Sequence, residues 1–190
     1  MSETEYNNFY KKLAFYTAPT LLGIKCASLV SLSSDEFDLD FHAQNFNHRA
    51  ASKALKIKIL QSGKNKKLLL VYNEKLLKKH LAEYDVKCVL KKFGYSEGCS
   101  LDECLDCLSV RFSESGNFPH EIGIFLDYPV EDVIGFIRNK GGNFKLCGCW
   151  KVYGSEENAL RKFANYDKCR KFLCGRLSDG DDIYKALKIS

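Results

Sequence analysis

Hydrophobic residues recur along the chain with spacings that change from helical to strand-like and back. In residues 4–16, large apolar side chains return every three or four positions, which predicts one buried face of a helix that ends near Pro19. Residues 23–32 read as a short strand. Residues 33–54 have weak periodicity, so they predict a loop with a short helix near 46–54.

The middle of the chain has clearer boundaries. In the segment 55–73, residues 55–60 alternate between apolar and polar positions, a turn that contains glycine and asparagine follows, and an apolar run returns over 68–73, which predicts a β-hairpin. Two helices follow, and Gly94 ends the second. Ser100 begins another helix, because Ser100 and Glu103 have the spacing of a capping box, in which each side chain bonds the other residue's backbone N–H.

The segment 117–177 is the most informative part of the chain. His120–Leu126 reads as a strand, Pro129 stands where a first helical residue is expected, and Lys145–Tyr153 reads as a second strand. A crossover of this length between two strands predicts a parallel, right-handed βαβ unit. A long final helix capped by Ser155 completes the segment.

Together these elements predict an α+β fold with an α/β-like C-terminal half. We expect a mixed sheet of about four to five strands that helices cover. The length suits a single domain over residues 1–190. Its parts are an N-terminal helix, strand and hairpin (1–73), a helical segment (74–113) and a βαβα block (117–177).

The composition indicates the cellular compartment of the protein more clearly than its activity. The nine cysteines are odd in number and scattered, and the N-terminus lacks a basic start followed by an apolar core, so a secreted disulfide scaffold is disfavoured. No apolar run approaches the roughly 20 residues of a membrane helix. We therefore expect a cytoplasmic protein whose thiols are mostly reduced and packed as small apolar groups, which fits an anaerobic or strongly reducing cell.

Charge and motifs exclude several classes of ligand. The net charge of +5 comes from lysine clusters that have acidic neighbours or lie at turns, a pattern typical of solvated surfaces, so nucleic-acid binding is disfavoured. The chain has no glycine-rich dinucleotide motif and no P-loop. Glutamates at the predicted helix starts would also repel a phosphate group. The sequence identifies no cofactor.

Several long motifs occur in order along the chain: APTLLGIKCASLVSL, FPHEIGIFLDYPVEDVIGFI, NFKLCGCWKVYG and a helix containing YDKCR. They resemble the DUF3793 family of clostridia and related Firmicutes, and the similarity covers most of the chain. The sequence departs from the family pattern at Asp127 and Cys149, where the family favours Gly and Tyr. The resemblance implies a cytoplasmic bacterial protein of about this length, with no established activity, cofactor or catalytic residue.

The sharpest hypothesis for an enzyme pairs His120 with Cys147. If the two predicted strands are parallel neighbours, these residues lie near the same edge of the sheet, where a histidine activates a thiol as a nucleophile. No third, orienting residue is evident. The alternative is a histidine at the rim of the sheet that bonds only to the backbone.

Three further residues are candidates for ligand binding. Arg111 and Glu121 predict a structural ion pair, with an anionic ligand on Arg111 as the alternative. Tyr153 lies at the carboxyl end of a predicted strand, which is where parallel sheets bind their ligands.

The cysteines allow a metal or redox site as another alternative. Cys104 and Cys107 form a Cys-x-x-Cys motif, and with Cys147 and Cys149 they offer four thiolates for zinc or an iron–sulfur cluster. Cys104 also lies in the apolar stripe of its predicted helix, so buried thiols are the favoured interpretation and no metal site is assigned.

The sequence therefore leaves the function open. The leading hypothesis is a protein that binds a small molecule or a protein partner. The alternatives are thiol- and histidine-dependent catalysis by His120 and Cys147, and metal or redox sensing by the four cysteines. The oligomeric state is not indicated.

Overall fold

The computed structural model describes residues 2–114 and 118–189, so Asn117, with which the predicted C-terminal block begins, lies outside the described residues. The chain divides into two compact units. The first runs to Leu76 and resumes at Tyr166, and the second comprises Leu77–Asn165. The predicted α+β class is confirmed, and the expectation of a single domain stays a prediction.

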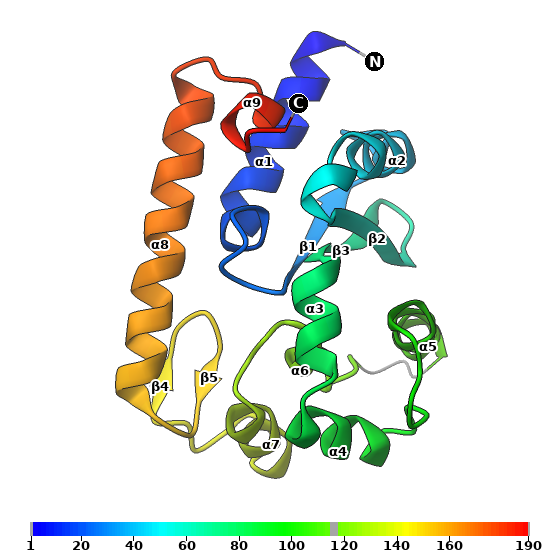
Figure 1. Ribbon diagram of the computed structural model, residues 1–190, viewed down its shortest axis with the longest axis vertical. Coiled ribbons are helices and arrows are strands. Elements are labelled where there is room, and N and C mark those ends of the chain that lie inside the picture. Colours follow the sequence, from blue (N-terminus) through cyan, green and yellow to red (C-terminus); the bar gives the residue numbers. More distant parts are fainter. Residues whose placement is uncertain (1, 115–117, 190) are drawn as a thin grey trace. The chain divides into compact units, whose positions relative to one another are not determined.

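Figure 1 shows the helices and strands of the chain, and most of them belong entirely to one unit or the other. The first unit holds α1 (Glu3–Leu21), β1 (Ala27–Ser33), α2 (Leu39–Arg49), the 3-10 helix η1 (Ala51–Lys53), β2 (Leu55–Ser62), β3 (Lys66–Asn73) and α9 (Ile183–Ala186). The second holds α4 (Tyr84–Lys92), α5 (Leu101–Glu114), α6 (Ile122–Phe125), α7 (Val130–Arg138), β4 (Leu146–Cys147) and β5 (Lys151–Val152). Helices α3 (Glu74–Leu81) and α8 (Glu156–Ser178) cross the boundary.

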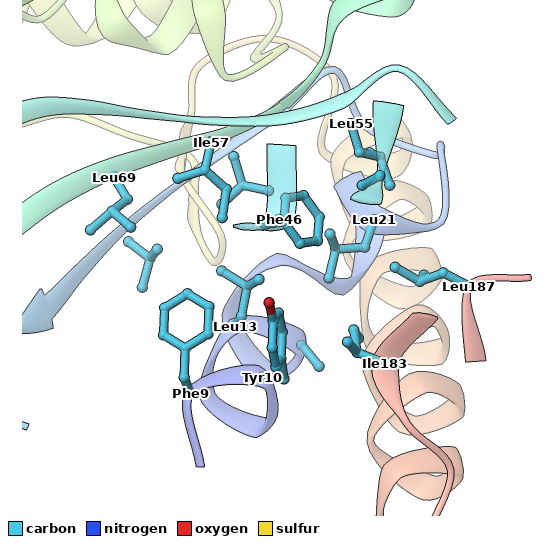
Figure 2. Close-up of a cluster of buried hydrophobic side chains, with 14 of the residues drawn as sticks. Phe9, Tyr10, Leu13, Leu21, Phe46, Leu55, Ile57, Leu69, Ile183 and Leu187 are labelled. Carbon is cyan, nitrogen blue, oxygen red and sulfur yellow. The ribbon is translucent and has the colours of Figure 1, made fainter. Parts of the chain in front are cut away.

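The first unit is built on a three-stranded antiparallel sheet with β3 in the centre. The predicted hairpin is confirmed as β2 and β3. Residues 69–72 of β3 are all buried, so both faces of the central strand are covered. Figure 2 shows the core on one side of this sheet, where side chains from α1, α2, β2, β3 and the C-terminal segment converge: Phe9, Tyr10, Leu13, Leu21, Phe46, Leu55, Ile57, Leu69, Ile183 and Leu187.

Pro19 lies inside α1 and does not end it, which corrects the predicted boundary. A proline lacks the N–H that would bond the carbonyl four residues earlier. Here that carbonyl belongs to Phe15, and the Arg170 side chain donates to it at 3.0 Å. The helix continues to Leu21 because a side chain supplies the missing donor.

Residues 33–54 contain a regular helix, α2, where only a loop and a short helix near 46–54 were expected. Asp38 caps its start by accepting a hydrogen bond from the Phe41 N–H at 3.1 Å. The buried face of α2 includes His42, whose ring stacks on Phe9 with centroids 4.0 Å apart. The apolar spacing is helical once a histidine is counted as a core residue.

The predicted strand His120–Leu126 is wrong, because this segment is the short helix α6 and its flanking turns. The N–H groups of Ile122, Gly123 and Ile124 each bond a carbonyl three residues earlier. Its backbone is therefore satisfied locally, without a neighbouring strand. Short apolar runs fit a buried strand and a buried helix equally well, which is the reason for the error.

The predicted strand Lys145–Tyr153 is also wrong, since it is a tight antiparallel hairpin of β4 and β5. Gly148 lies in the turn, where a Cβ atom would come within 2.2 Å of the Phe163 ring. The two sheets of the described chain contain only antiparallel pairs, so the predicted βαβ unit and the mixed sheet of four to five strands are corrected.

Asp132 joins α7 to the β4–β5 hairpin. Its carboxylate is 3 % exposed and accepts hydrogen bonds from the Trp150 Nε1–H at 2.7 Å and from the backbone N–H groups of Tyr153 and Gly154 at 2.7 and 2.8 Å. Three donors offset the cost of burying the carboxylate. Tyr128 stacks on Trp150, with ring centroids 5.0 Å apart.

Within the described residues, no helix combines the length and the apolar character that a membrane span requires.

His42 gives the first unit a pH-dependent stability. Burial lowers the pKa of His42, although Glu5 and Asp38 act in the opposite direction. The unfolded chain therefore takes up a proton before the folded chain as the pH falls. Stability from neutral His42 is complete above about pH 6.5 and is lost below it. We expect His42→Phe to make the unfolding free energy from urea titrations less steep between about pH 7 and about pH 5.

The control for this prediction is His48→Phe, an exposed position on the same helix. The unfolding free energy of this variant should depend on pH as steeply as that of the wild-type protein. Equal slopes for wild type and His42→Phe would contradict the assignment.

Asp132→Asn should loosen the hairpin around the only tryptophan of the chain. An asparagine accepts through one oxygen only, so its amide N–H group faces the Trp150 or backbone donors. We expect a loss of about 2–3 kcal/mol in unfolding free energy and a red shift of tryptophan emission. Asp102→Asn, the same change at an exposed residue of α5, should do neither. An unshifted emission spectrum in Asp132→Asn would show that the carboxylate does not hold the indole.

Candidate functional site

A cavity of about 440 Å³ lies in the second unit among α3, α4, the loop 93–100 and the start of α5. Apolar side chains from three helices form much of its wall, namely Leu81, Leu90 and Leu101. Lys78, Lys87 and Lys91 add positive charge. All of its lining residues belong to the segment 78–104, so one stretch of chain builds the whole site.

The end of α4 directs the chain into this cavity. Gly94 has φ +85° and follows the last helical turn, as the predicted stop at this residue requires. The Gly94 N–H bonds the Lys91 carbonyl at 3.1 Å, and the Tyr95 N–H bonds the Leu90 carbonyl at 3.2 Å. This pair of bonds is the Schellman motif, which reverses the chain and places Tyr95 against the cavity.

Tyr95 connects the cavity to α6. The side chain is 5 % exposed, and its ring lies 5.7 Å from that of Phe125, centroid to centroid. Burial, with the nearby Glu121 charge, raises the pKa of Tyr95, so the hydroxyl stays protonated at neutral pH. That hydroxyl is buried and has no geometrically acceptable hydrogen-bond partner among the described residues.

The predicted ion pair between Arg111 and Glu121 is confirmed. Glu121 is 1 % exposed, so its carboxylate depends on this partner. Arg111 also donates to the Phe93 carbonyl at 3.1 Å. One guanidinium therefore joins α5 to the chain just before Tyr95 and to the start of α6.

His80 makes a second connection to α6. Its Nε2 atom lies 3.0 Å from the Ile124 carbonyl oxygen, and its Nδ1 atom lies 3.4 Å from a carboxylate oxygen of Glu83. The two contacts fix the ring at the end of α3, close to the cavity residues Leu81 and Ala82.

The start of α5 carries a disulfide bond between Cys99 and Cys104, and both residues line the cavity. The predicted capping box is confirmed, because the Ser100 N–H bonds Glu103 at 2.7 Å and the Glu103 N–H bonds Ser100 at 3.3 Å. The other seven cysteines are not assigned to a disulfide bond. Among them, Cys88 on α4 faces the same cavity.

The four-cysteine metal hypothesis gains no support from this arrangement. Cys104 is bonded to Cys99 and not grouped with Cys107, while Cys147 and Cys149 are exposed in the β4–β5 hairpin. Across residues 2–114 and 118–189, no group of three or more His, Cys, Asp or Glu side chains could hold a metal ion.

The structure does not place His120 and Cys147 on neighbouring parallel strands, which was the arrangement that suggested their pairing. His120 is exposed just before α6, with its ring 5.1 Å from that of Phe136, and Cys147 is exposed in β4 opposite Lys151. Neither residue lies in a parallel strand. Their catalytic role stays a prediction that no contact in the structure supports.

Tyr153 has a clear structural role beside its predicted role in ligand binding. Its hydroxyl donates to the Gly142 carbonyl at 2.9 Å. Its ring covers Gly135, where a Cβ atom would come within 2.4 Å of it. Tyr153 thus fastens the hairpin to α7, and ligand binding by Arg111, Glu121 and Tyr153 stays a prediction.

The residues around the cavity were not identified from the sequence. In the sequence, the lysines of the cavity have the pattern of solvated helix faces. Two of its cysteines, Cys88 and Cys99, matched no motif. No spacing rule joins Cys99 to Cys104, because helical neighbours are three or four positions apart, whereas these residues are five apart and Cys99 precedes the helix.

The comparisons with known proteins give a family and nothing more. Residues 13–187 match the model of the family described as "Protein of unknown function (DUF3793)". No curated protein matches the chain, and no solved structure does.

Glu121→Gln should destabilise the second unit by removing the partner of Arg111. Arg111 is 35 % exposed, so water recovers part of the loss. We expect a decrease of about 1–3 kcal/mol in unfolding free energy, measured by urea titration. The matched control is Glu97→Gln, which breaks the exposed Lys91–Glu97 pair and should leave the midpoint unchanged. Equal effects of the two substitutions would show that the buried pair does not stabilise this region.

Proposed function

We propose that this chain, which belongs to the DUF3793 family, binds a small organic anion in the cavity between α3, α4 and α5. The observation that carries the proposal is a concave site of ligand size with an apolar wall and several lysines. A volume of about 440 Å³ lies within the range of small-molecule sites, roughly 300–1,000 Å³.

The apolar wall favours a ligand with a hydrophobic body. Leu81, Leu90 and Leu101 come from different helices, and each presents side-chain surface to the same space. Transfer of an apolar group from water to such a wall is favourable by about 25 cal/mol per Å² buried. A fully polar ligand would gain little from it.

The charges favour a ligand with an anionic group. Three lysines and one glutamate, Glu97, line the cavity. Lys91 lies 2.9 Å from Glu97, which leaves a positive balance from Lys78 and Lys87. Few charged side chains oppose an anion here, in contrast to the acidic first turns of α7 and α8.

The proposed setting is the bacterial cytoplasm of a strongly reducing cell. Seven cysteines without an assigned disulfide agree with such a compartment, because cysteines in an oxidising one tend to form disulfides. A small molecule is favoured over a protein partner because the site is concave and confined to one short segment. Catalysis by His120 and Cys147 has no such observation behind it.

A fluorescent anion tests the proposal directly. The probe is 8-anilinonaphthalene-1-sulfonate, which has an apolar ring system and a sulfonate group. We expect saturable binding that Ala82→Phe, which fills the cavity, weakens by about tenfold or more, equivalent to about 1.4 kcal/mol. Lys78→Gln combined with Lys87→Gln should weaken it as well, while the uncharged analogue N-phenyl-1-naphthylamine should be insensitive to the loss of lysines.

The control is Ala164→Phe, the same substitution at an exposed position of α8. It should bind the probe as the wild-type protein does. If Ala82→Phe and Ala164→Phe bind the probe equally well, the cavity is not the binding site.

A further inference from the structure

A disulfide bond lies in the wall of the cavity. Cys99 and Cys104 are joined by a disulfide, and both line the space that the lysines surround. In a reducing cytoplasm, disulfides are usually transient, catalytic or redox-sensing. A disulfide that also faces a ligand-sized cavity is placed to meet a small reactant.

The fold does not need this disulfide to begin α5. The capping box between Ser100 and Glu103 satisfies the first N–H groups, and the Cys104 N–H bonds the Ser100 carbonyl at 3.0 Å. The bond spans only five positions in sequence. Opening it therefore leaves the start of the helix with its own hydrogen bonds.

The two sulfur atoms differ in access. Cys99 is half-buried in the loop before the helix, while Cys104 is 4 % exposed on the inner face of α5. An incoming thiolate reaches Cys99 more easily. The lysines of the cavity attract an anionic reactant and favour the thiolate form of a bound thiol.

We propose that this cavity is a thiol–disulfide exchange site for small anionic thiols. The inference rests on the proposed function, because it names the class of anion that the cavity takes. The thiolate of the ligand attacks the Cys99 Sγ atom, the Cys99–Cys104 bond breaks, and Cys104 leaves as a thiolate that takes up a proton. The ligand is then held to Cys99 as a mixed disulfide.

A second molecule of the same thiol completes the reaction. It attacks the ligand sulfur of the mixed disulfide and releases Cys99 as a thiolate. Two thiols are oxidised to one disulfide, and the protein disulfide is reduced to two thiols. The free Cys88 thiol is not required for this balance.

Glutathione and S-methylglutathione provide the two arms of the test. S-methylglutathione has the same charged groups without a thiol, so its binding, measured by calorimetry, tests the cavity alone. Glutathione tests the exchange, followed by acid quenching, alkylation and peptide mass spectrometry. We expect S-methylglutathione to bind, and glutathione to open the Cys99–Cys104 disulfide of the oxidised protein.

Charge variants separate a binding site from a merely exposed disulfide. Lys78→Gln combined with Lys87→Gln should slow the reaction with glutathione by about fivefold or more, as expected for lost electrostatic attraction of an anion. The rate with neutral 2-mercaptoethanol should stay the same. Cys174→Ser, which alters a free thiol of α8 in the first unit, should change neither rate.

A trapping variant tests whether Cys99 can hold the mixed disulfide. Cys104→Ser leaves Cys99 without its partner, so the Cys99 thiolate should attack oxidised glutathione, release one glutathione and keep the other as a stable mixed disulfide. Reduced wild-type protein treated in the same way should instead recover the Cys99–Cys104 bond. Far-ultraviolet circular dichroism of Cys104→Ser checks the fold, and Cys104→Ala replaces it if the serine variant is unfolded.

The outcomes are distinct. If S-methylglutathione binds but glutathione leaves the disulfide intact, or reacts as fast without the lysines, the exchange site is refuted and ligand binding survives. If S-methylglutathione and the fluorescent anion both fail to bind, the proposed function falls together with the exchange site. Alkylation of both cysteines in protein purified under oxidising conditions would also overturn the exchange.

Discussion

The part of the second unit from the end of α4 to α6 is organised around the buried carboxylate of Glu121. Glu121 has almost no contact with solvent, and a carboxylate at that depth needs a charged or hydrogen-bonding partner. Arg111 supplies the charge from α5 and also donates to the Phe93 carbonyl at the end of α4. A single guanidinium therefore determines how α5, the end of α4 and the entry to α6 meet. Because a guanidinium is planar, it can serve several acceptors without changing its position.

The cavity depends on this arrangement. The Arg111 bond to Phe93 fixes the residue before Gly94, and the reversal at Gly94 sets Tyr95 against Phe125. His80 completes the support through the Ile124 carbonyl. The segment 118–126 does not line the cavity. It provides the charge, the carbonyl and the aromatic ring on which the lining segments rest, which gives this motif-rich stretch a structural role.

Local signals in the sequence predicted local structure well. The capping box at Ser100, the reversal at Gly94 and the hairpin 55–73 depend on neighbouring residues, and the structure confirms them. The errors arose where tertiary packing decides between helix and strand, as in residues 120–126 and 145–153. The Arg111–Glu121 pair was predicted because Arg111 lies shortly before Glu121 in the sequence, ten positions away.

The site was harder to predict because no motif encodes it. Lys78 and Lys87 lie on helix surfaces that resemble any solvated face, and only the turn after α4 makes them part of a concave surface. Cys104 was assigned to a Cys-x-x-Cys motif with Cys107, although its partner is Cys99. The motif predicted the wrong pair of cysteines. The direction of the chain before a helix begins cannot be read from sequence spacing, so the position of Cys99 was not predictable.

The contribution of the Cys99–Cys104 disulfide to stability decides whether this bond can open and close reversibly. A cross-link stabilises a protein more when the loop that it closes in the unfolded chain is longer, and this one spans only five positions. Cys88 faces the same cavity, so thiol and disulfide coexist within one small volume. The capping box and the Arg111–Glu121 pair hold α5 without this bond. The oxidised and reduced forms can therefore share one fold, which is the condition that reversible exchange requires.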